Sequence, residues 1–329
     1  MRIAVVYEIT DNPLFSTAGQ PQDDRLTEFA QPCEVNDLLR LIQDAGYDTE
    51  VVDGPAELLR RATEIRRHCG IVFNKSIGFR GLERKIHVPA ICQLFDIPFI
   101  GSSAYAMTAA RHKFHTNCLL RGLGLPVPGT RLYEKHGNVD LESIRPPYIV
   151  KPNHESDAIG ISTDAVVNSP AAARARARWV VDKFEQPAII EEFIPGEEWK
   201  VAVIGNGTDT TAVGCVGVMR DGVPIVGSLQ TRDDVVGNTL SYYQPTRTEL
   251  VHQAGEYAVK IHTFLGLLDY SRCDFRLSLD ETLVCMEVST HPELRANSSF
   301  GAAARLTLGS AREVVRKIIA VACARYQLA

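Results

Sequence analysis

The chain has 329 residues, of which 45% are hydrophobic and 23% are charged, and its formal net charge is −5. The length exceeds the roughly 100 to 200 residues of one typical domain, so it predicts two or three compact units with a cleft between them. The composition is that of an ordinary globular protein, and the small acidic excess excludes the basic stripe with which proteins bind nucleic acid.

Neither the opening residues nor the cysteines indicate export or a membrane. The opening MRIAVVYEI predicts a first buried strand better than a signal peptide, and no run of about 20 apolar residues occurs. The eight cysteines are scattered without a CxxC pair, which favours buried thiols over a disulfide framework or a zinc site. We therefore expect a cytoplasmic protein whose partners include neither nucleic acid nor a membrane.

The first hundred residues alternate between strand and helix patterns. The predicted strands are 2–7, 48–53, 70–74 and 97–101, and the predicted helices are 36–45, 56–67 and 88–95. This order predicts a parallel sheet covered by helices, whose functional groups gather at the carboxyl ends of the strands. Asn74 and the loop behind it lie at such an end.

The middle of the chain begins a new unit. A helix predicted over 104–121 stops at the glycines and prolines of GLGLPVPGT. A strand at 148–152, a glycine-containing loop, a further strand, a helix at 170–183 and a strand at 188–194 follow. They predict a small α+β module whose loop could fold over a ligand, with the ARARAR run as a solvated helix face.

The last part of the chain predicts a second sheet. Its expected strands are 199–205, 211–219, 271–279 and 282–289, with helices at 248–267 and 311–325.

Two segments contain residues suited to a nucleotide. In KPNHESDAIG, Lys151 ends a strand beside a flexible polar loop, which is one way to hold a polyphosphate, although an ordinary strand end gives the same pattern. In IIEEFIPGEEW, paired acids precede a Pro-Gly turn. They could accept hydrogen bonds from an adenine amino group and ribose hydroxyls between the apolar walls of Phe193 and Ile194. The alternative there is an exposed hairpin edge.

A third segment, CDFRLSLDETLVCMEVSTHPELRANSSF, contains two acids inside apolar strands. Asp274 and Glu287 hold equivalent places on two strands joined by a tight turn at Asp280 and Glu281, so both can point to one side. Acids in such strands are costly unless they are paired or metal-bound, and hard oxygen ligands suit Mg²⁺. The pattern favours a shared cation over ordinary salt bridges.

The order of these segments resembles the ATP-grasp superfamily, and most closely its D-alanine-D-alanine ligase branch, from residue 72 to residue 300. The resemblance implies an α/β ATP-grasp fold with an N-terminal parallel α/β domain (1–102), a central lid subdomain (103–190) and a C-terminal mixed-sheet catalytic subdomain (191–329). It also implies an ATP-dependent ligase that phosphorylates a carboxylate and lets an amine attack the acylphosphate. The expected cofactors are ATP and Mg²⁺, with Mn²⁺ as the alternative. The expected partners are a small carboxylate and a small amine, and a homodimer is a further expectation because the family is often dimeric.

The resemblance also assigns roles to residues. The nucleotide would contact Lys113, Lys151, Glu191, Glu192, Ile194 and Glu198, of which the two lysines hold phosphates. The metal would be bound by Asp274, Glu287 and Ser289. Arg272 would stabilise the tetrahedral intermediate, and Ser298 would receive the carboxylate of the second substrate. Arg232 would replace the lysine of the family's catalytic loop, since an arginine can fork onto phosphate.

Several positions depart from the family pattern. The glycine-rich N-terminal stretch with its substrate-binding glutamate is absent, and Glu8 is the remaining candidate. The other departures are His112, Asp157 with Ala158, Ser289 and Glu293, while a lone His291 is more typical of a structural residue. These changes predict substrates other than two D-alanines in a specialised biosynthetic route. A cell-wall D-alanine-D-alanine ligase and a nucleotide-binding protein without turnover remain the alternatives. Both Glu287→Gln and Lys151→Ala should abolish turnover with little loss of stability.

Overall fold

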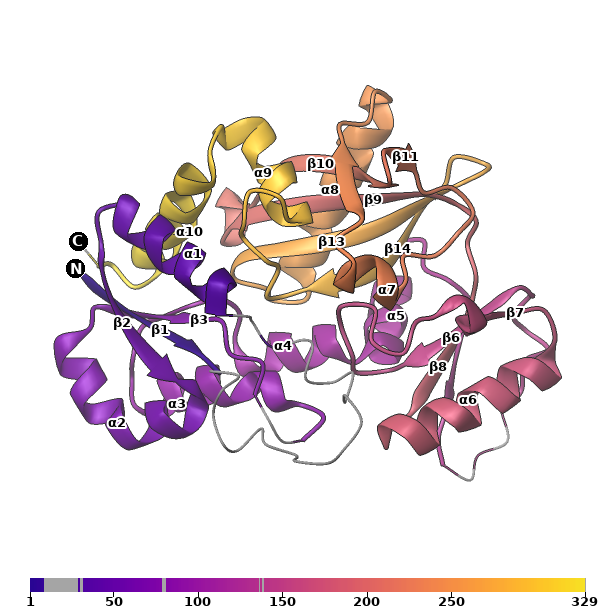
Figure 1. Ribbon diagram of the computed structural model, residues 1–329, viewed down its shortest axis with the longest axis horizontal. Helices are drawn as coiled ribbons and strands as arrows, with labels where there is room; N and C mark the ends of the chain where they lie inside the picture. Colours follow the sequence, from indigo (N-terminus) through magenta and orange to yellow (C-terminus); the bar gives the residue numbers. More distant parts are fainter. Residues whose placement is uncertain (9–28, 30–31, 79–80, 136, 138, 329) are drawn as a thin grey trace.

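The protein is described by a computed structural model that covers residues 1–8, 29, 32–78, 81–135, 137 and 139–328. Its elements form three sheets, one parallel and two antiparallel, with helices packed against each of them (Figure 1). The expected mixed α/β architecture is thus confirmed. No helix within these described residues is long and apolar enough to cross a membrane. All eight cysteines are free thiols.

The N-terminal sheet is parallel, as predicted, with the strand order β2-β1-β3-β4. Its elements are β1 (Arg2–Tyr7), α1 (Pro32–Asp44), β2 (Asp48–Asp53), α2 (Gly54–His68), β3 (Ile71–Asn74), the short helix η3 (Arg84–Ile86), α3 (His87–Leu94) and β4 (Phe99–Ile100). Residues 3–6 and 71–73 are buried on both faces, which explains why their sequence is apolar without alternation.

The single helix predicted over 104–121 is wrong. The segment forms α4 (Ala104–Arg111) and α5 (Lys113–Gly122), which are separated at His112 by a backbone conformation of φ −82° and ψ 88°. Partners outside the helices satisfy the groups that the break exposes: the Lys113 N–H donates to the Asn153 carbonyl at 3.2 Å, and His112 accepts from the His115 N–H at 3.3 Å. Helical periodicity continues through the break, so the sequence alone does not reveal it.

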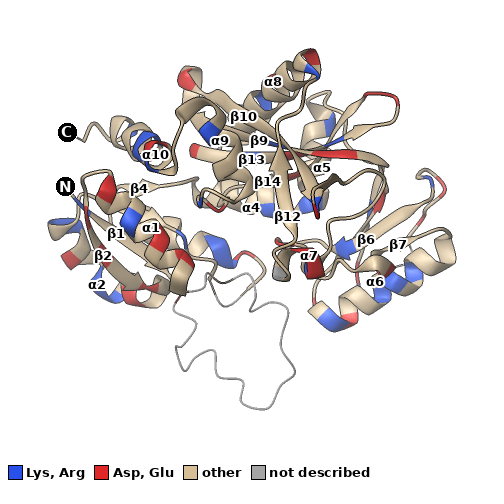
Figure 2. Ribbon diagram, turned by 45° about the horizontal axis from the view of Figure 1, so that its top comes forward, with Lys and Arg blue, Asp and Glu red and all other residues tan. Residues whose placement is uncertain are grey.

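The lid sheet is antiparallel and has the order β5-β8-β6-β7. Its elements are β5 (Thr130–Tyr133), β6 (Tyr148–Pro152), η4 (Thr163–Ala165), β7 (Val166–Val167), α6 (Pro170–Phe184) and β8 (Ala188–Glu192). On α6, Ala173 and Ala177 are buried whereas Arg178 is exposed, which confirms the predicted solvated face (Figure 2). The lid has its own apolar cluster, which includes Tyr148, Val150 and Phe184.

The third sheet has the order β11-β10-β9-β13-β14, with β12 paired to β10. Its strands are β9 (Gly196–Gly205), β10 (Thr211–Arg220), β11 (Val223–Pro224), β12 (Leu240–Tyr243), β13 (Asp269–Ser278) and β14 (Leu283–Ser289). The helices of this part are η5 (Gly207–Asp209), α7 (Arg232–Val236), α8 (Thr248–Phe264), α9 (Ser299–Leu308) and α10 (Ala311–Arg325). The sequence analysis does not predict α9, which packs closely on β10: a Cβ added at Gly214 would lie 2.0 Å from the Ala303 carbonyl oxygen.

The two faces of this sheet are covered by different helices. Val201 and Val203 of β9 belong to the cluster under α8, whereas Ala202 and Ile204 belong to the cluster under α9 and α10. This division follows from the two-residue period of a strand.

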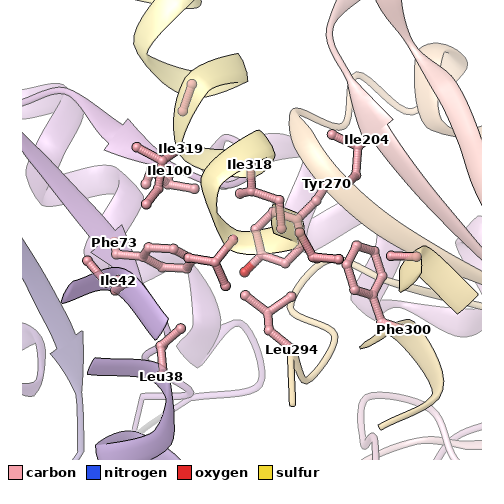
Figure 3. Close-up of a cluster of buried hydrophobic side chains, with 14 of the residues drawn as sticks. Leu38, Ile42, Phe73, Ile100, Ile204, Tyr270, Leu294, Phe300, Ile318 and Ile319 are labelled. Carbon is pink, nitrogen blue, oxygen red and sulfur yellow. The ribbon is translucent and has the colours of Figure 1, made fainter. Parts of the chain in front are cut away.

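One apolar cluster joins the N-terminal sheet to the third sheet. Figure 3 shows Leu38, Ile42 and Phe73 of the first unit facing Tyr270 and Leu294 of the last. Because this cluster is continuous, the two units form one base, and the lid packs its own core beside it (Figure 1). The limits at residues 102 and 190 remain predictions.

Candidate active site

A cavity of about 360 Å³ is lined by residues from all three units. Its walls are the loop after β3, the end of β6 with the lid loop, the α7 segment, the adjacent strands β9, β13 and β14, and the 290–299 loop. This size is in the range of small-molecule sites. The cavity is therefore the candidate active site.

The floor of the cavity is a charged area on the third sheet. Glu198 and Lys200 share the β9 face that carries Ala202, so the face that is apolar under α9 becomes charged where α9 no longer covers it. In the register of the sheet, Lys200 lies opposite Asp274, and Asp274 lies opposite Glu287. The register of these three strands thus places side chains of both charges in one row across the sheet.

The predicted juxtaposition of Asp274 and Glu287 is confirmed by this register. Asp274 also forms the salt bridges that the sequence analysis held as an alternative: Arg272 Nε lies 2.6 Å from Oδ1, and Lys200 Nζ lies 2.8 Å from Oδ2. Burial disfavours the carboxylate, but Arg272 and Lys200 outweigh it and hold the pKa of Asp274 at about 2. Asp274 is therefore an anion at neutral pH, and a carboxylate oxygen keeps acceptor capacity beyond one hydrogen bond.

Glu287 is the more accessible acid, with 30% of its side chain exposed. Lys113 Nζ lies 3.4 Å from it, and Ser289 lies two residues further along the same strand face. Two carboxylates and a hydroxyl fit a hard divalent cation, which also takes water and phosphate oxygens. Among the described residues, no cluster of three or more acidic, histidine or cysteine side chains could hold a metal.

Lys151 projects into the cavity from the lid. Its ammonium lies 2.6 Å from Glu191, whose side chain is fully buried and also accepts from Asn117 at 2.7 Å. Burial opposes the charged form of Lys151, but Glu191 outweighs it and raises the pKa of the ammonium. Lys151 therefore stays protonated. Glu191 does not line the cavity but supports the lysine that does.

Of the remaining residues predicted to contact the nucleotide, only some line the cavity. Glu192 points to the other side of β8, where it accepts from Gly129 N at 3.3 Å and Arg145 N at 2.8 Å. The Ile194 carbonyl accepts from Arg276 at 3.4 Å, and Arg276 reaches Glu198 at the same distance. Glu198 lines the cavity, whereas Glu192 and Ile194 do not.

Lys113 lies behind Glu287 rather than in the cavity wall. Its ammonium also donates to the Glu155 carbonyl. Burial lowers the pKa of Lys113, and Glu287 only partly offsets this effect. The break between α4 and α5 turns this lysine inward towards β14.

The lid loop is anchored through the buried carboxylate of Glu155. Arg84 Nη2 lies 2.9 Å from one oxygen, and Gln186 Nε2 donates to the other at 2.8 Å. His154 is buried next to it with its ring edge against His112. Burial, together with His112, lowers the pKa of His154 to about 3.

Arg232 connects the α7 segment to the lid loop. Its guanidinium donates to the Asp157 carbonyl at 2.8 Å, and its backbone N–H donates to the Ile161 carbonyl at 3.0 Å. Asp157 lines the cavity, but Arg232 does not. Arg232 thus positions the loop in this conformation, and its predicted contact with phosphate remains a prediction.

Arg272 and Ser298 lie at the end of the cavity that α9 closes. Ser298 is the N-cap of α9 and accepts from Gly301 N at 3.0 Å, and Arg272 Nη1 lies 3.0 Å from the Ser299 hydroxyl. An N-cap and the first turn of a helix favour an anion, which agrees with the carboxylate expected there.

Glu8 does not line the cavity. Its buried carboxylate accepts from the Ser76 hydroxyl and, at 2.9 Å each, from the N–H groups of Ile77 and Gly78. Burial raises the pKa of Glu8 and these hydrogen bonds oppose the change. Gly78 is required here, because its φ is +74° and an added Cβ would lie 2.2 Å from the Arg84 carbonyl oxygen. Glu8 thus holds the loop after β3.

Seven charged residues that line the cavity were not predicted from the sequence: Glu34, Lys75, Lys85, Lys200, Asp234, Arg276 and Arg295. Lys200 and Arg276 lie two residues from Glu198 and Asp274, so strand alternation could have identified them. Lys75 and Arg295 lie in loops, and no periodic signal marks them. His291 and Glu293 also line the cavity.

A lid that carries a lysine over paired carboxylates on a β-sheet defines the ATP-grasp class of enzymes. Residues 120–320 match the family model described as "D-ala D-ala ligase C-terminus". Because the match covers more than half of the chain, the protein belongs to the D-alanine-D-alanine ligase family. It is an ATP-dependent carboxylate-amine ligase, and the family uses ATP with a divalent metal.

Individual relatives agree with this assignment. D-alanine--D-alanine ligase B of Chromobacterium violaceum is 29% identical over 82% of this chain and 84% of its own length. An uncharacterized protein of Sinorhizobium fredii is 26% identical over 99% and 98%. The D-alanine--D-alanine ligase from Bacillus anthracis, solved in complex with ATP, has a TM-score of 0.74 at 16% identity, with 99% of each chain covered. This last likeness shows the shared fold.

Proposed function

We propose that this ligase joins a carboxylate, activated as an acylphosphate, to the amine of an amino-acid-like acceptor, and that its substrates are not two D-alanines. The observation that carries the proposal is the row formed by Asp274 and Glu287 beneath Lys151 in one cavity. The route it serves would be a specialised biosynthetic one.

The nucleotide would lie between the lid and the third sheet. Lys151 supplies positive charge for the phosphates, and Glu198 is available to ribose hydroxyls on the cavity wall. Lys113, behind Glu287, would act on the phosphates through Glu287. The apolar lining residues Ile149, Phe275 and Met286 suit the faces of a purine. In this arrangement Glu191 acts through Lys151. A contact of Glu192 or Ile194 with the base would come from the backbone at the end of β8.

Asp274, Glu287 and Ser289 would hold Mg²⁺ or Mn²⁺. When bound, such an ion neutralises charge on the phosphoryl group that is transferred. Arg272 and Lys200 keep Asp274 ionised, so this carboxylate needs no deprotonation before it binds a cation.

The reaction requires two displacements. A substrate carboxylate oxygen attacks the γ-phosphorus and ADP leaves. The acceptor amine then attacks the acyl carbon, phosphate leaves, and the amine proton goes to solvent. Arg272 would stabilise the oxyanion that forms in the second step. The lid loop, positioned by Arg232 through Asp157, excludes water from the acylphosphate.

Two features support substrates that differ from D-alanine. Glu8 is enclosed by the 76–78 loop and does not reach the cavity, and Glu293 adds a carboxylate to the wall at the acceptor end. A site that binds two substrates with small neutral side chains does not require the negative charge of Glu293.

The test is a ligation screen. The protein would be incubated with ATP, Mg²⁺ and pools of D- and L-amino acids, with ADP release and new amides followed by mass spectrometry. We expect ADP release that depends on an amine and yields an amide other than D-alanyl-D-alanine. Glu287→Gln is the control that should lose this release. D-alanyl-D-alanine as the main product would establish the cell-wall reaction instead, and tight ATP binding without any product would favour a protein without turnover.

A further inference from the structure

Lys75 is a cavity-lining cation that the proposed reaction does not use. It follows Asn74, the last residue of β3, and its ammonium reaches across to the Pro292 carbonyl at 3.1 Å. The charged groups that act on it are Glu293, Lys85, Glu34 and Asp157, none of which belongs to the row on the third sheet. Lys75 therefore lies at the end of the cavity formed by the N-terminal unit and the 290–299 loop.

Two other lysines that line the cavity form ion pairs, whereas among the described residues Lys75 does not. Lys151 pairs with Glu191, and Lys200 pairs with Asp274. Within the part of the chain that the structure describes, Lys75 forms no ion pair, and the Pro292 carbonyl is its only side-chain hydrogen-bond partner. An ammonium has three donors, so two of them remain for a ligand. Burial lowers the pKa of Lys75, and the charge of Glu293 only partly offsets this effect.

Two of the acids whose charge acts on Lys75, Glu293 and Glu34, already have a cationic partner. Arg295 forms an ion pair with Glu34 and lies 3.7 Å from Glu293 through its Nε. Glu293 also accepts from the backbone N–H groups of Leu294 and Arg295 at 2.9 and 3.1 Å. These contacts hold both acids to the 290–299 loop, and neither acid forms an ion pair with Lys75.

The proposed reaction accounts for two substrate carboxylates. The reacting one would lie near Asp274 and Glu287, and that of the acceptor would lie at Ser298 and the first turn of α9. Lys75 is a third positive site. We propose that it binds an additional carboxylate on a substrate side chain, so that one substrate is an acidic amino acid of the aspartate or glutamate class. This inference rests on the proposed ligase function and names the substrate class of the same site.

The experiment compares each acid with its own amide by titration calorimetry of the full chain saturated with ADP and Mg²⁺. The probes are glutamate against glutamine and aspartate against asparagine, each as the D and L forms. We expect at least one acid to bind about tenfold or more tightly than its amide, because a hydrogen bond to a charged group is worth about 1.5–3 kcal/mol. Lys75→Met should remove this preference, and Lys75→Arg should keep part of it.

Lys260 provides a matched control outside the cavity. Its ammonium also donates to a backbone carbonyl, that of Leu123, at 3.2 Å. Lys260→Met should retain the preference for the acid. Thermal melting identifies any variant that does not fold, and Lys75→Gln then replaces Lys75→Met.

The outcomes separate the inference from the proposed function. Equal binding of acid and amide, no binding of any acid, or equal weakening of both by Lys75→Met would overturn the inference, since Lys75 would then not recognise a side-chain charge. The proposed function survives these results if ADP still binds and amine-dependent ADP release is still found. Failure to bind nucleotide at all would remove the proposed function, and the inference with it.

Discussion

Replacement of Lys151 should cost stability as well as activity, contrary to the expectation from sequence alone. The ammonium lies 2.6 Å from Glu191, and the two side chains are 7% and 0% exposed. Lys151→Met leaves the carboxylate buried without its cation. Breaking a buried pair by removing one partner costs about 3–5 kcal/mol. Asn117 still donates to Glu191 at 2.7 Å, so we expect a value of about 3 kcal/mol, at the lower end.

The double variant Lys151→Met/Glu191→Gln tests the cause. Glutamine has the shape of glutamate without its charge, so the second change should recover most of the lost free energy of unfolding. Both variants should lack turnover. If the loss came instead from the packing of the lysine stem, the double variant would be no more stable than the single one.

Guanidinium denaturation of the nucleotide-free protein at pH 7 measures these differences. Lys135→Met is the control, because Lys135 is an exposed residue of the lid unit and its loss should change the free energy of unfolding by less than about 0.5 kcal/mol. A Lys151→Met variant as stable as the unmodified protein would refute the reasoning.

Three further predictions concern other parts of the site. Glu287→Gln should lower the rate of ADP release by about a hundredfold or more and change the melting temperature little, since this side chain is partly exposed; an unchanged rate would contradict its role. The pKa of His154 is about 3 in the folded protein, against 6.5 for an unperturbed histidine. The contribution of the neutral ring to the free energy of unfolding is therefore complete above about pH 6.5 and is lost as the pH falls. Denaturation should show about 1–2 kcal/mol less stability at pH 5 than at pH 7, and His154→Gln should flatten this dependence; equal slopes would exclude His154 as the cause. Arg232→Ala removes the bond to the Asp157 carbonyl and should raise the KM for ATP by up to about tenfold with little change in unfolding, whereas an unchanged KM would show that the lid loop does not depend on it.

Most strands and helices follow directly from residue patterns. The opposition of Asp274 and Glu287 could be predicted because two strands joined by a tight turn have a fixed register. The parallel N-terminal sheet could be predicted because strands and helices alternate there. Both features are set by residues that are close together in the sequence.

The break at His112 and the roles of Glu191, Glu8 and Lys75 could not be predicted in this way. His112 ends a helix because Asn153, about forty residues later, accepts the next N–H group. Glu191 pairs with Lys151 because β6 and β8 are adjacent in the lid. In each case the partner is remote in sequence, and no periodicity encodes it.

The sequence by itself determined the order of the elements, the face on which each strand residue points, and the family to which its motifs correspond. The tertiary structure decided which charges are paired, which side chains line the cavity, and which lysine is left for a ligand. The physical reason is that strand alternation and turn geometry are local, whereas burial and the sign of the nearest charge depend on segments that only folding brings together.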